Sequence, residues 1–191
     1  MKIAIVHDDL MRRGGAEQVV LSMLKAFPEA DLYTMCYKPE LTYPEFKNYK
    51  IKTSAFQTLA KNEKYMKWLF FPFGILAMKM LRIKGYDIVL ISTTYCAKYV
   101  QIDPSSKVYI YTYTPFRLAW NPASYKEYNN SKGLIRSLFN FVVKRLQTID
   151  KKEAQKGNVF IAMTKETAQR ITDAYGIKNI HILYPPVKCN L

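Results

Sequence analysis

The sequence lacks the short motifs that mark several common kinds of site. Its three cysteines, Cys36, Cys96 and Cys189, lie far apart and show no Cys-x-x-Cys spacing, so neither a disulfide framework nor a zinc site is indicated. This cysteine usage favours a reducing, cytosolic compartment. The GxGxxG pattern of dinucleotide-binding loops and the GK[ST] ending of the P-loop are absent as well.

Long hydrophobic runs are also missing. The opening MKIAIVHDDL reaches charged residues too soon for a signal peptide. The longest uncharged segment, WLFFPFGILAM, is well short of the roughly 20 residues that a membrane span requires, and it contains Pro72 and Gly74. We therefore expect no transmembrane helix.

Acidic residues are few. The chain has 29 Lys and Arg against 15 Asp and Glu, a formal net charge of +14, which attracts nucleic acid, an anionic membrane surface or phosphorylated substrates. No motif for reading nucleic acid accompanies the charge, so nucleic acid is the least supported partner. The segment KYMKWLFFPFGILAMKMLRIK fits a peripheral contact with the inner face of the cell membrane, and it equally fits a buried helix or hairpin.

The sequence does contain a regular alternation of apolar runs and helical patterns. With 49% hydrophobic residues, the 191-residue chain can bury a substantial core. The apolar runs are KIAIVH, LYTMCY, DIVLIST, KVYIYTYT, VFIAMT and IHILYPP. Because short continuous apolar strands separated by helices are typical of a parallel sheet covered on both faces, the sequence predicts an α/β fold with a Rossmann-like, doubly wound parallel sheet.

Three helices are readable from their periodicity and ends. The first begins at Gly14-Gly15 and stops at Pro28. The helix after VFIAMT has Thr164 as its N-cap and Gly176 as its left-handed C-terminal residue. The third runs from about residue 133 to 156, and its apolar residues fall on one side: Ile135, Leu138, Phe139, Val142, Leu146 and Ile149.

The stretch HDDLMRRGGAEQVV joins the first apolar run to the first helix. Gly14 and Gly15 would let backbone approach a ligand closely, and the helix N-terminus would add a partial positive charge, so this turn is a candidate phosphate site. The two glycines equally suit a tight turn alone. Paired acids after a first strand also occur in phosphorylated receiver domains. That module needs an aspartate at the end of its third strand, where this chain has Ser92-Thr93-Thr94.

A second candidate segment, YTYTPFRLAWNPASYKEY at residues 111–128, follows the strand KVYIY at the same edge of the predicted sheet. It carries hydroxyl groups, the rings of Tyr113, Phe116 and Trp120, and the guanidinium of Arg117. Aromatic platforms beside a planar cation suit sugar rings or phosphate-bearing ligands. The same side chains would also serve for packing and one internal ion pair, so both interpretations stay open.

Five segments occur together in the order and spacing of one family. They are VHDDLMRRGGAEQVVLSML, GYDIVLISTTYCAKYV, YTYTPFRLAW, IAMTKETAQRITDAYG and ILYPPV. Over nearly its whole length the sequence resembles the N-terminal domain of bacterial retaining glycosyltransferases of family 4, particularly the mannosyltransferase-like branch of surface-polysaccharide assembly. The resemblance implies one half of a GT-B enzyme: residues 1–184 form the Rossmann-like, acceptor-side domain, residues 185–191 begin the interdomain linker, and the donor-binding domain lies beyond.

The resemblance also implies roles for individual residues. It gives catalytic positions at Tyr113, Arg117 and Asp150, and substrate-binding positions at Asp8, Gly14, Gly15, Glu17, Thr114, Pro115, Trp120 and Thr164. It implies no metal and no cofactor, the nucleotide-sugar being a substrate. The chain departs from the family at Tyr113, where a histidine is usual, and at Met163, where an asparagine is usual. Tyrosine stays neutral near pH 7, whereas histidine exchanges a proton there.

Three functional hypotheses follow. The first is the acceptor-binding half of a glycosyltransferase that moves a sugar from a nucleotide-sugar to a glycan or a lipid-linked acceptor, with a donor-binding domain on the same or a second polypeptide. The second is a freestanding, non-catalytic domain of glycosyltransferase descent that binds a glycan, a lipid phosphate or a partner enzyme. Nucleic-acid binding, motivated by charge alone, is the third.

Overall fold

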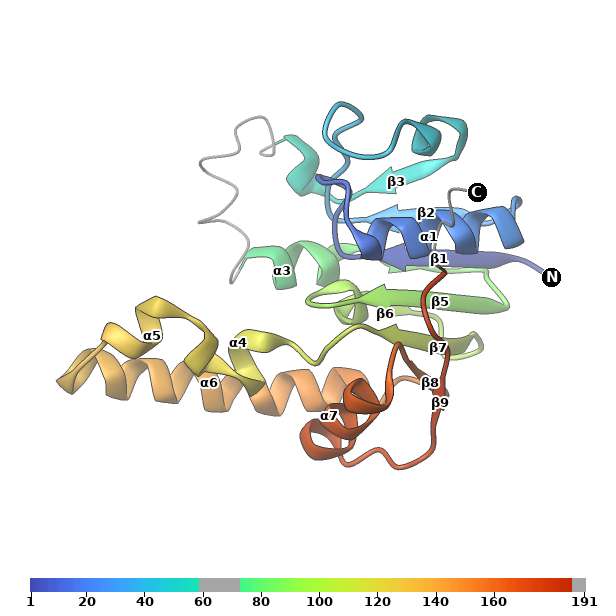
Figure 1. The fold of residues 1–191 in the computed structure, drawn as a ribbon. Coiled ribbons are helices and arrows are strands. Elements are labelled where there is room, and N and C mark those ends of the chain that lie inside the picture. The colour runs from blue at the N-terminus through green and yellow to red at the C-terminus, as the bar shows by residue number, and fades with distance from the viewer. Residues whose placement is uncertain (59–72, 187–191) are drawn as a thin grey trace, which may run out of the picture.

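The computed structural model describes residues 1–58 and 73–186, and its core is a seven-stranded, all-parallel sheet (Figure 1). In spatial order the sheet consists of β3 (Ile51–Thr53), β2 (Asp31–Thr34), β1 (Ile3–His7), β5 (Ile88–Thr93), β7 (Lys107–Thr112), β8 (Val159–Ala162) and β9 (Ile180–Ile182). A separate parallel pair joins β4 (Arg82–Ile83) and β6 (Gln101–Ile102). The predicted Rossmann-like α/β class is confirmed.

Helices and short 3-10 turns connect these strands, and three helices follow one another between β7 and β8. Within residues 1–58 and 73–186 the helices are α1 (Gly15–Ala26), α3 (Phe73–Met80), α4 (Arg117–Trp120), α5 (Lys126–Asn130), α6 (Gly133–Ala154) and α7 (Lys165–Tyr175), with 3-10 turns at Pro44–Asn48, Ala55–Thr58, Ala97–Tyr99 and Pro122–Ser124. The strand β3 and the β4–β6 pair were not predicted, because they are only two or three residues long and carry no apolar run.

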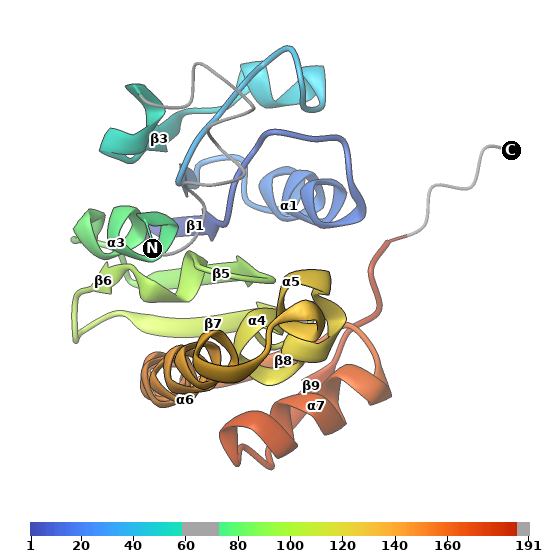
Figure 2. The ribbon, with the colours of Figure 1, turned by 90° about the vertical axis from the view of Figure 1, so that its left-hand side faces the viewer.

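Side chains alternate between the two faces of the central strands, as the pleat requires. In β1, Ile5 packs with Val20 and Leu24 of α1 on one face of the sheet. Its neighbours Ala4 and Val6 belong to a second cluster, which includes buried residues of α3, α6 and α7 on the other face. Figure 2 shows α1 and α3 on opposite sides of the sheet. The prediction that helices cover both faces is therefore confirmed.

The strand order reverses at the centre of the sheet. The chain goes from β1 outward to β2 and β3, then returns to the other side of β1 and continues outward through β5, β7, β8 and β9. In open α/β sheets, ligands bind outside the carboxyl ends of the strands at such a switch point. The topology therefore directs attention to the ends of β1 and β5, at His7 and Ser92.

The predicted ends of α7 are confirmed. Thr164 caps the helix by accepting a hydrogen bond from the backbone N–H of Thr167 at 3.2 Å. At the other end Gly176 has φ of 75°, the left-handed conformation that favours glycine. The helix α1 also begins where the glycine pair predicts, with Gly14 as N-cap.

The long helix α6 forms as predicted, but its apolar residues do not lie on one buried side. The residues that it buries are Val143, Leu146, Asp150, Glu153 and Ala154. Ile135, Leu138 and Ile149, which the spacing grouped with Leu146, are exposed. For Ile135 and Leu138 Figure 1 gives the reason: the first half of α6 extends beyond the carboxyl edge of the strands, where the sheet offers no surface to pack against.

Residues 59–72, which include nine of the 21 residues of the segment considered above as a membrane contact, lie outside the described residues, as do 187–191 at the predicted linker. The segment resumes in α3, where Ala77 and Met78 are buried and Leu76 is exposed. Within residues 1–58 and 73–186, no helix combines the length and the apolar character needed to cross a bilayer.

Candidate functional site

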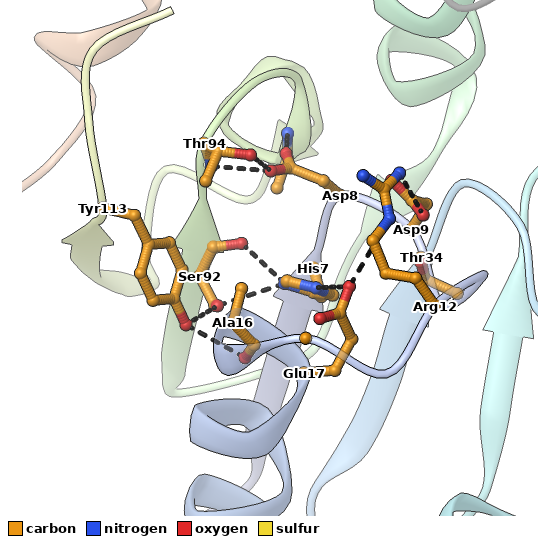
Figure 3. A network of polar contacts seen from close by, with 12 residues as sticks. His7, Asp8, Asp9, Arg12, Ala16, Glu17, Thr34, Ser92, Thr94 and Tyr113 are labelled. Atoms are coloured by element: carbon orange, nitrogen blue, oxygen red, sulfur yellow. Dashed lines mark hydrogen bonds and ion pairs between the residues drawn. The ribbon is translucent and has the colours of Figure 1, made fainter. Parts of the chain in front are cut away.

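The ends of β1 and β5 are tied together by His7 and Ser92. The Nδ1 atom of His7 lies 3.0 Å from the backbone oxygen of Ser92 and 3.1 Å from its hydroxyl oxygen (Figure 3). A carbonyl oxygen only accepts hydrogen bonds, so Nδ1 carries the proton and Nε2 faces the other way. On that side the nearest charged oxygen is Oε1 of Glu17, 3.9 Å from Nε2.

Asp8, the next residue, fills a pocket of backbone donors. Its carboxylate accepts hydrogen bonds from the side chains of Thr93 and Thr94 and from four successive backbone N–H groups, those of residues 94–97, at 2.6–3.0 Å. Successive N–H groups of this kind form a concavity that binds anions. Here the protein's own carboxylate occupies it, and Asp8 is buried. In this structure Asp8 therefore joins the loops after β1 and β5.

The glycine pair forms the entrance to α1. Gly14 has extended backbone, and a Cβ added to it would lie 2.6 Å from Oε2 of Glu17. A Cβ added to Gly15 would meet nothing within 4 Å. Gly14 thus makes room for the Glu17 carboxylate, whereas the space beside Gly15 is open. The first N–H groups of α1 have no partner further back in the helix, as at any helix N-terminus.

A group of charged side chains surrounds His7. Burial alone lowers the pKa of its imidazole, but the carboxylates of Glu17, Asp8 and Asp9 outweigh burial and raise the pKa above the usual value. Arg12 donates from Nη2 to both oxygens of Asp9 at 3.1 Å and has its Nε 3.9 Å from Glu17. Figure 3 shows Arg12 between these two acids. The protonated form of His7 is favoured because the acids around it outnumber the bases.

Tyr113, at the end of β7, completes the network. Its hydroxyl donates to the backbone oxygen of Ala16 at 3.1 Å, so the Ser92 hydroxyl donates to Tyr113 across 2.9 Å. Burial raises the pKa of Tyr113 well above its usual value, and nearby acids add to this. The tyrosine is therefore a neutral group that links β5, β7 and α1 (Figure 3).

The aromatic segment lines a pocket of about 350 Å³ between the start of α4 and one side of α7. The residues around it are Thr114, Pro115, Arg117, Trp120, Asn121, Arg170, Asp173 and Ala174. Four of these were predicted as site residues from the sequence. Neither Arg117 nor Arg170 has an ion pair within 4.0 Å among the described residues. The pocket therefore presents two guanidinium groups next to an indole, with the single carboxylate of Asp173 beside them, a combination that suits an anionic or sugar ligand.

Asp150 lies behind this pocket rather than in it. It is completely buried, and its carboxylate pairs with the ammonium of Lys98 at 2.9 Å. It also accepts hydrogen bonds from Trp120 Nε1 at 2.9 Å, Tyr99 Oη at 2.6 Å and Tyr175 Oη at 2.8 Å. Burial alone raises the pKa of Asp150, but Lys98 and the hydrogen bonds from Tyr99 and Trp120 lower it below its usual value. The ionised carboxylate thus fixes the orientation of the Trp120 indole.

The predicted site residues therefore fall into separate places. Asp8, Gly14, Gly15, Glu17 and Tyr113 lie at the switch point, and Thr114, Pro115, Arg117 and Trp120 line the pocket. Thr164 caps α7, and its partner Thr167 donates from its hydroxyl to the backbone oxygen of Tyr113 at 3.2 Å. Sequence reasoning missed His7, Ser92 and Arg170. The position of His7 at the end of the first strand was a usable signal for it, whereas Arg170 had none.

No group of three or more His, Cys, Asp or Glu side chains within residues 1–58 and 73–186 is arranged to hold a metal ion. In the same part of the chain Cys36 and Cys96 are buried, free thiols. Burial raises the pKa of both, that of Cys36 to about 12, and nearby acids act in the same direction. Neither thiol is therefore a ready nucleophile.

Comparison with known proteins agrees with this architecture. No protein-family model and no curated protein matches the sequence. Among solved structures, Anabaena HepE in complex with UDP matches with a TM-score of 0.57 and 12% identity, and HepE in complex with UDP and glucose with 0.54 and 12%. Each match covers 98% of this chain but only 44% or 45% of HepE. The chain therefore has a glycosyltransferase-like, Rossmann-type fold and spans less than half the length of HepE.

Proposed function

We propose that this chain is the acceptor-binding half of a metal-independent, retaining glycosyltransferase. The observation that carries the proposal is the switch point itself, where the glycine turn, the start of α1 and Tyr113 meet at the carboxyl ends of the central strands. The likeness of the fold to a UDP-bound protein supports it, and so does the family resemblance of the sequence. The mannosyltransferase-like branch is part of this proposal.

In the proposed enzyme the nucleotide-sugar is held mainly by a donor-binding domain, in cis or in trans. The open space at Gly15 lets its diphosphate approach the N–H groups at the start of α1, which stabilise the negative charge of the leaving group. The pocket beside Arg117 and Trp120 receives the acceptor, a glycan or a lipid-linked sugar, from the cytoplasmic side of the cell membrane.

The matched variants Gly15→Ala and Gly14→Ala test the donor site. Gly15→Ala adds a methyl group into open space, so it should leave thermal stability unchanged and obstruct the diphosphate. Gly14→Ala pushes against Glu17 and should lower stability. Titration calorimetry with UDP and UDP-glucose, on this chain alone and together with a donor-binding domain, measures the affinity. If Gly15→Ala leaves nucleotide affinity unchanged wherever the wild type binds, the glycine turn is not the diphosphate site.

A second candidate function is a non-catalytic glycan- or phosphate-binding domain. The observation in its favour is that the pocket at Arg117 and Arg170 is formed entirely within this chain. In addition, the Tyr113 hydroxyl donates its only proton to the backbone oxygen of Ala16, so this proton already serves the fold. Binding of a phosphorylated glycan to this chain, with no sugar transfer after a donor-binding domain is added, would favour this function over the first.

A further inference from the structure

The first half of α6 presents large apolar side chains to solvent. Leu134, Leu138 and Phe141 are 90%, 63% and 56% exposed. Their i, i+4, i+7 spacing places them on a single stripe of the helix. The buried Val143 and Leu146 lie on the opposite side. The stripe, which we call the α6 stripe and define as these three exposed residues, therefore faces away from the core.

The short helix α5 packs on α6 without covering this stripe. Its Tyr128 meets the ring of Phe139 edge-on, with ring centroids 6.0 Å apart, and its hydroxyl donates to Asn140 at 2.9 Å. Phe139 and Asn140 point to other sides of the helix than Leu138 and Phe141, since successive residues are about 100° apart. The two helices form a projection from the sheet (Figure 1), and the three side chains of the α6 stripe on it are exposed.

Positive charge accompanies the stripe. From residue 131 to 149 the chain has no acidic residue. Of the four basic residues in this range, Lys144 and Arg145 lie beside the stripe by their helical positions, whereas Arg136 lies on the α5 side, with its guanidinium 4.1 Å from the centroid of the Tyr128 ring. The guanidinium of Arg145 lies 5.3 Å from the centroid of the Phe141 ring, next to the stripe. An apolar stripe flanked by lysine and arginine is typical of helices that lie in the headgroup region of a bilayer.

We propose that the α6 stripe binds the surface of an anionic lipid bilayer. The charge distribution selects this occupant. A second copy of the chain, applied through the same stripe, would bring two basic helices together, and like charges oppose such a pairing. The phosphates of a nucleic acid would contact the lysine and arginine side chains but leave Leu134, Leu138 and Phe141 exposed to water. An anionic bilayer buries the apolar side chains and attracts the positively charged ones.

Lipid binding by α6 would also place the pocket at Arg117 and Trp120 relative to the bilayer. The first half of α6 extends beyond the carboxyl edge of the sheet, the edge at which the glycine turn also lies (Figure 1). The pocket residues Arg117 and Trp120 belong to α4, which packs on α6. Lipid binding would hold this pocket near the bilayer, within reach of a lipid-anchored ligand. The lipid contact itself does not depend on the proposed sugar transfer.

Vesicle flotation with the purified chain tests the proposal. The wild type should float with vesicles of phosphatidylcholine mixed with phosphatidylglycerol, and much less with phosphatidylcholine alone. Leu138→Ser/Phe141→Ser should lower the bound fraction about tenfold or more, because two exposed apolar side chains no longer enter the bilayer. The matched control Leu183→Ser/Tyr184→Ser removes two similarly exposed side chains elsewhere and should float like the wild type.

A second pair of variants separates the charge from the apolar stripe. Lys144→Gln/Arg145→Gln should weaken flotation on anionic vesicles, while Lys25→Gln/Lys47→Gln, with the same loss of net charge away from α6, should have a smaller effect. Circular dichroism and thermal unfolding check that each variant is folded. Flotation measures no sugar transfer, so its outcome is independent of the proposed enzyme.

Three results would overturn the proposal. One is a wild-type chain that does not float with anionic vesicles. Another is equal flotation of Leu138→Ser/Phe141→Ser and the wild type. The last is a wild-type chain that does not bind vesicles but forms a dimer in sedimentation analysis, if Leu138→Ser/Phe141→Ser abolishes that dimer. This result would mean that the α6 stripe binds a second copy of the chain.

Discussion

The hydroxyl of Tyr113 donates a hydrogen bond at 3.1 Å to the backbone oxygen of Ala16, a residue 97 positions earlier in the chain. This contact ties the end of β7 to the first turn of α1. Ser92, at the end of β5, lies 2.9 Å from the same hydroxyl. The glycine turn and the aromatic segment, which are separate features of the sequence, are thus joined into one network at the switch point.

Replacing Tyr113 by phenylalanine should lower the free energy of unfolding by about 1–3 kcal/mol, because the Ala16 carbonyl and the Ser92 hydroxyl lose a partner in a part-buried site. Urea unfolding measures the change. Tyr184→Phe, at an exposed position, is the control and should be neutral. Equal effects of the two substitutions would mean that the hydroxyl does not hold the network together.

The raised pKa of His7 predicts a pH-dependent stability. A group whose pKa is higher in the folded protein stabilises it fully below its unfolded pKa, near 6.5, and this contribution is lost as pH rises through the folded pKa. The difference in unfolding free energy between the wild type and His7→Gln should therefore be larger at pH 6 than above the raised pKa. Thermal unfolding across this pH range measures it. The exposed His181→Gln is the control, and a constant difference for His7→Gln would contradict the prediction.

The buried pair of Asp150 and Lys98 predicts a large loss of stability for Asp150→Asn. The substitution leaves the Lys98 ammonium buried without its counter-charge, which costs about 3–5 kcal/mol. The double variant Asp150→Asn/Lys98→Met should be less destabilised than Asp150→Asn, because it removes the stranded charge. Asp173→Asn, at an exposed carboxylate, should change stability by less than about 1 kcal/mol. Urea unfolding measures the free energy of unfolding of the three variants. If Asp150→Asn/Lys98→Met is less stable than Asp150→Asn, the stranded charge of Lys98 is not the cause of the loss.

Arg117→Ala and Arg170→Ala test the pocket. Neither guanidinium has an ion pair among the described residues, so both variants should keep thermal stability within about 1 kcal/mol. Each should lower sugar transfer strongly when a donor-binding domain is supplied, because the acceptor loses a positive contact. Arg82→Ala, exposed and outside the pocket, should transfer like the wild type. Unchanged transfer in Arg117→Ala would remove this residue from the site.

Much of the fold follows from short-range patterns. Continuous apolar strands between helices determined a parallel sheet covered on both faces, and the cap at Thr164 and the left-handed glycine at Gly176 fixed both ends of α7. The glycine pair likewise located the start of α1. These features depend on backbone conformations and hydrogen bonds within a few residues, which the local sequence specifies.

The tertiary structure decided the rest. It alone showed that the Asp8 carboxylate fills the loop after β5, that Asp150 supports Trp120 from inside the core, and that Arg170 joins Arg117 at one pocket. It also turned Leu138 of α6 to solvent. Such relationships join residues far apart in the chain and depend on where the sheet ends in space, and helical periodicity carries no information about either.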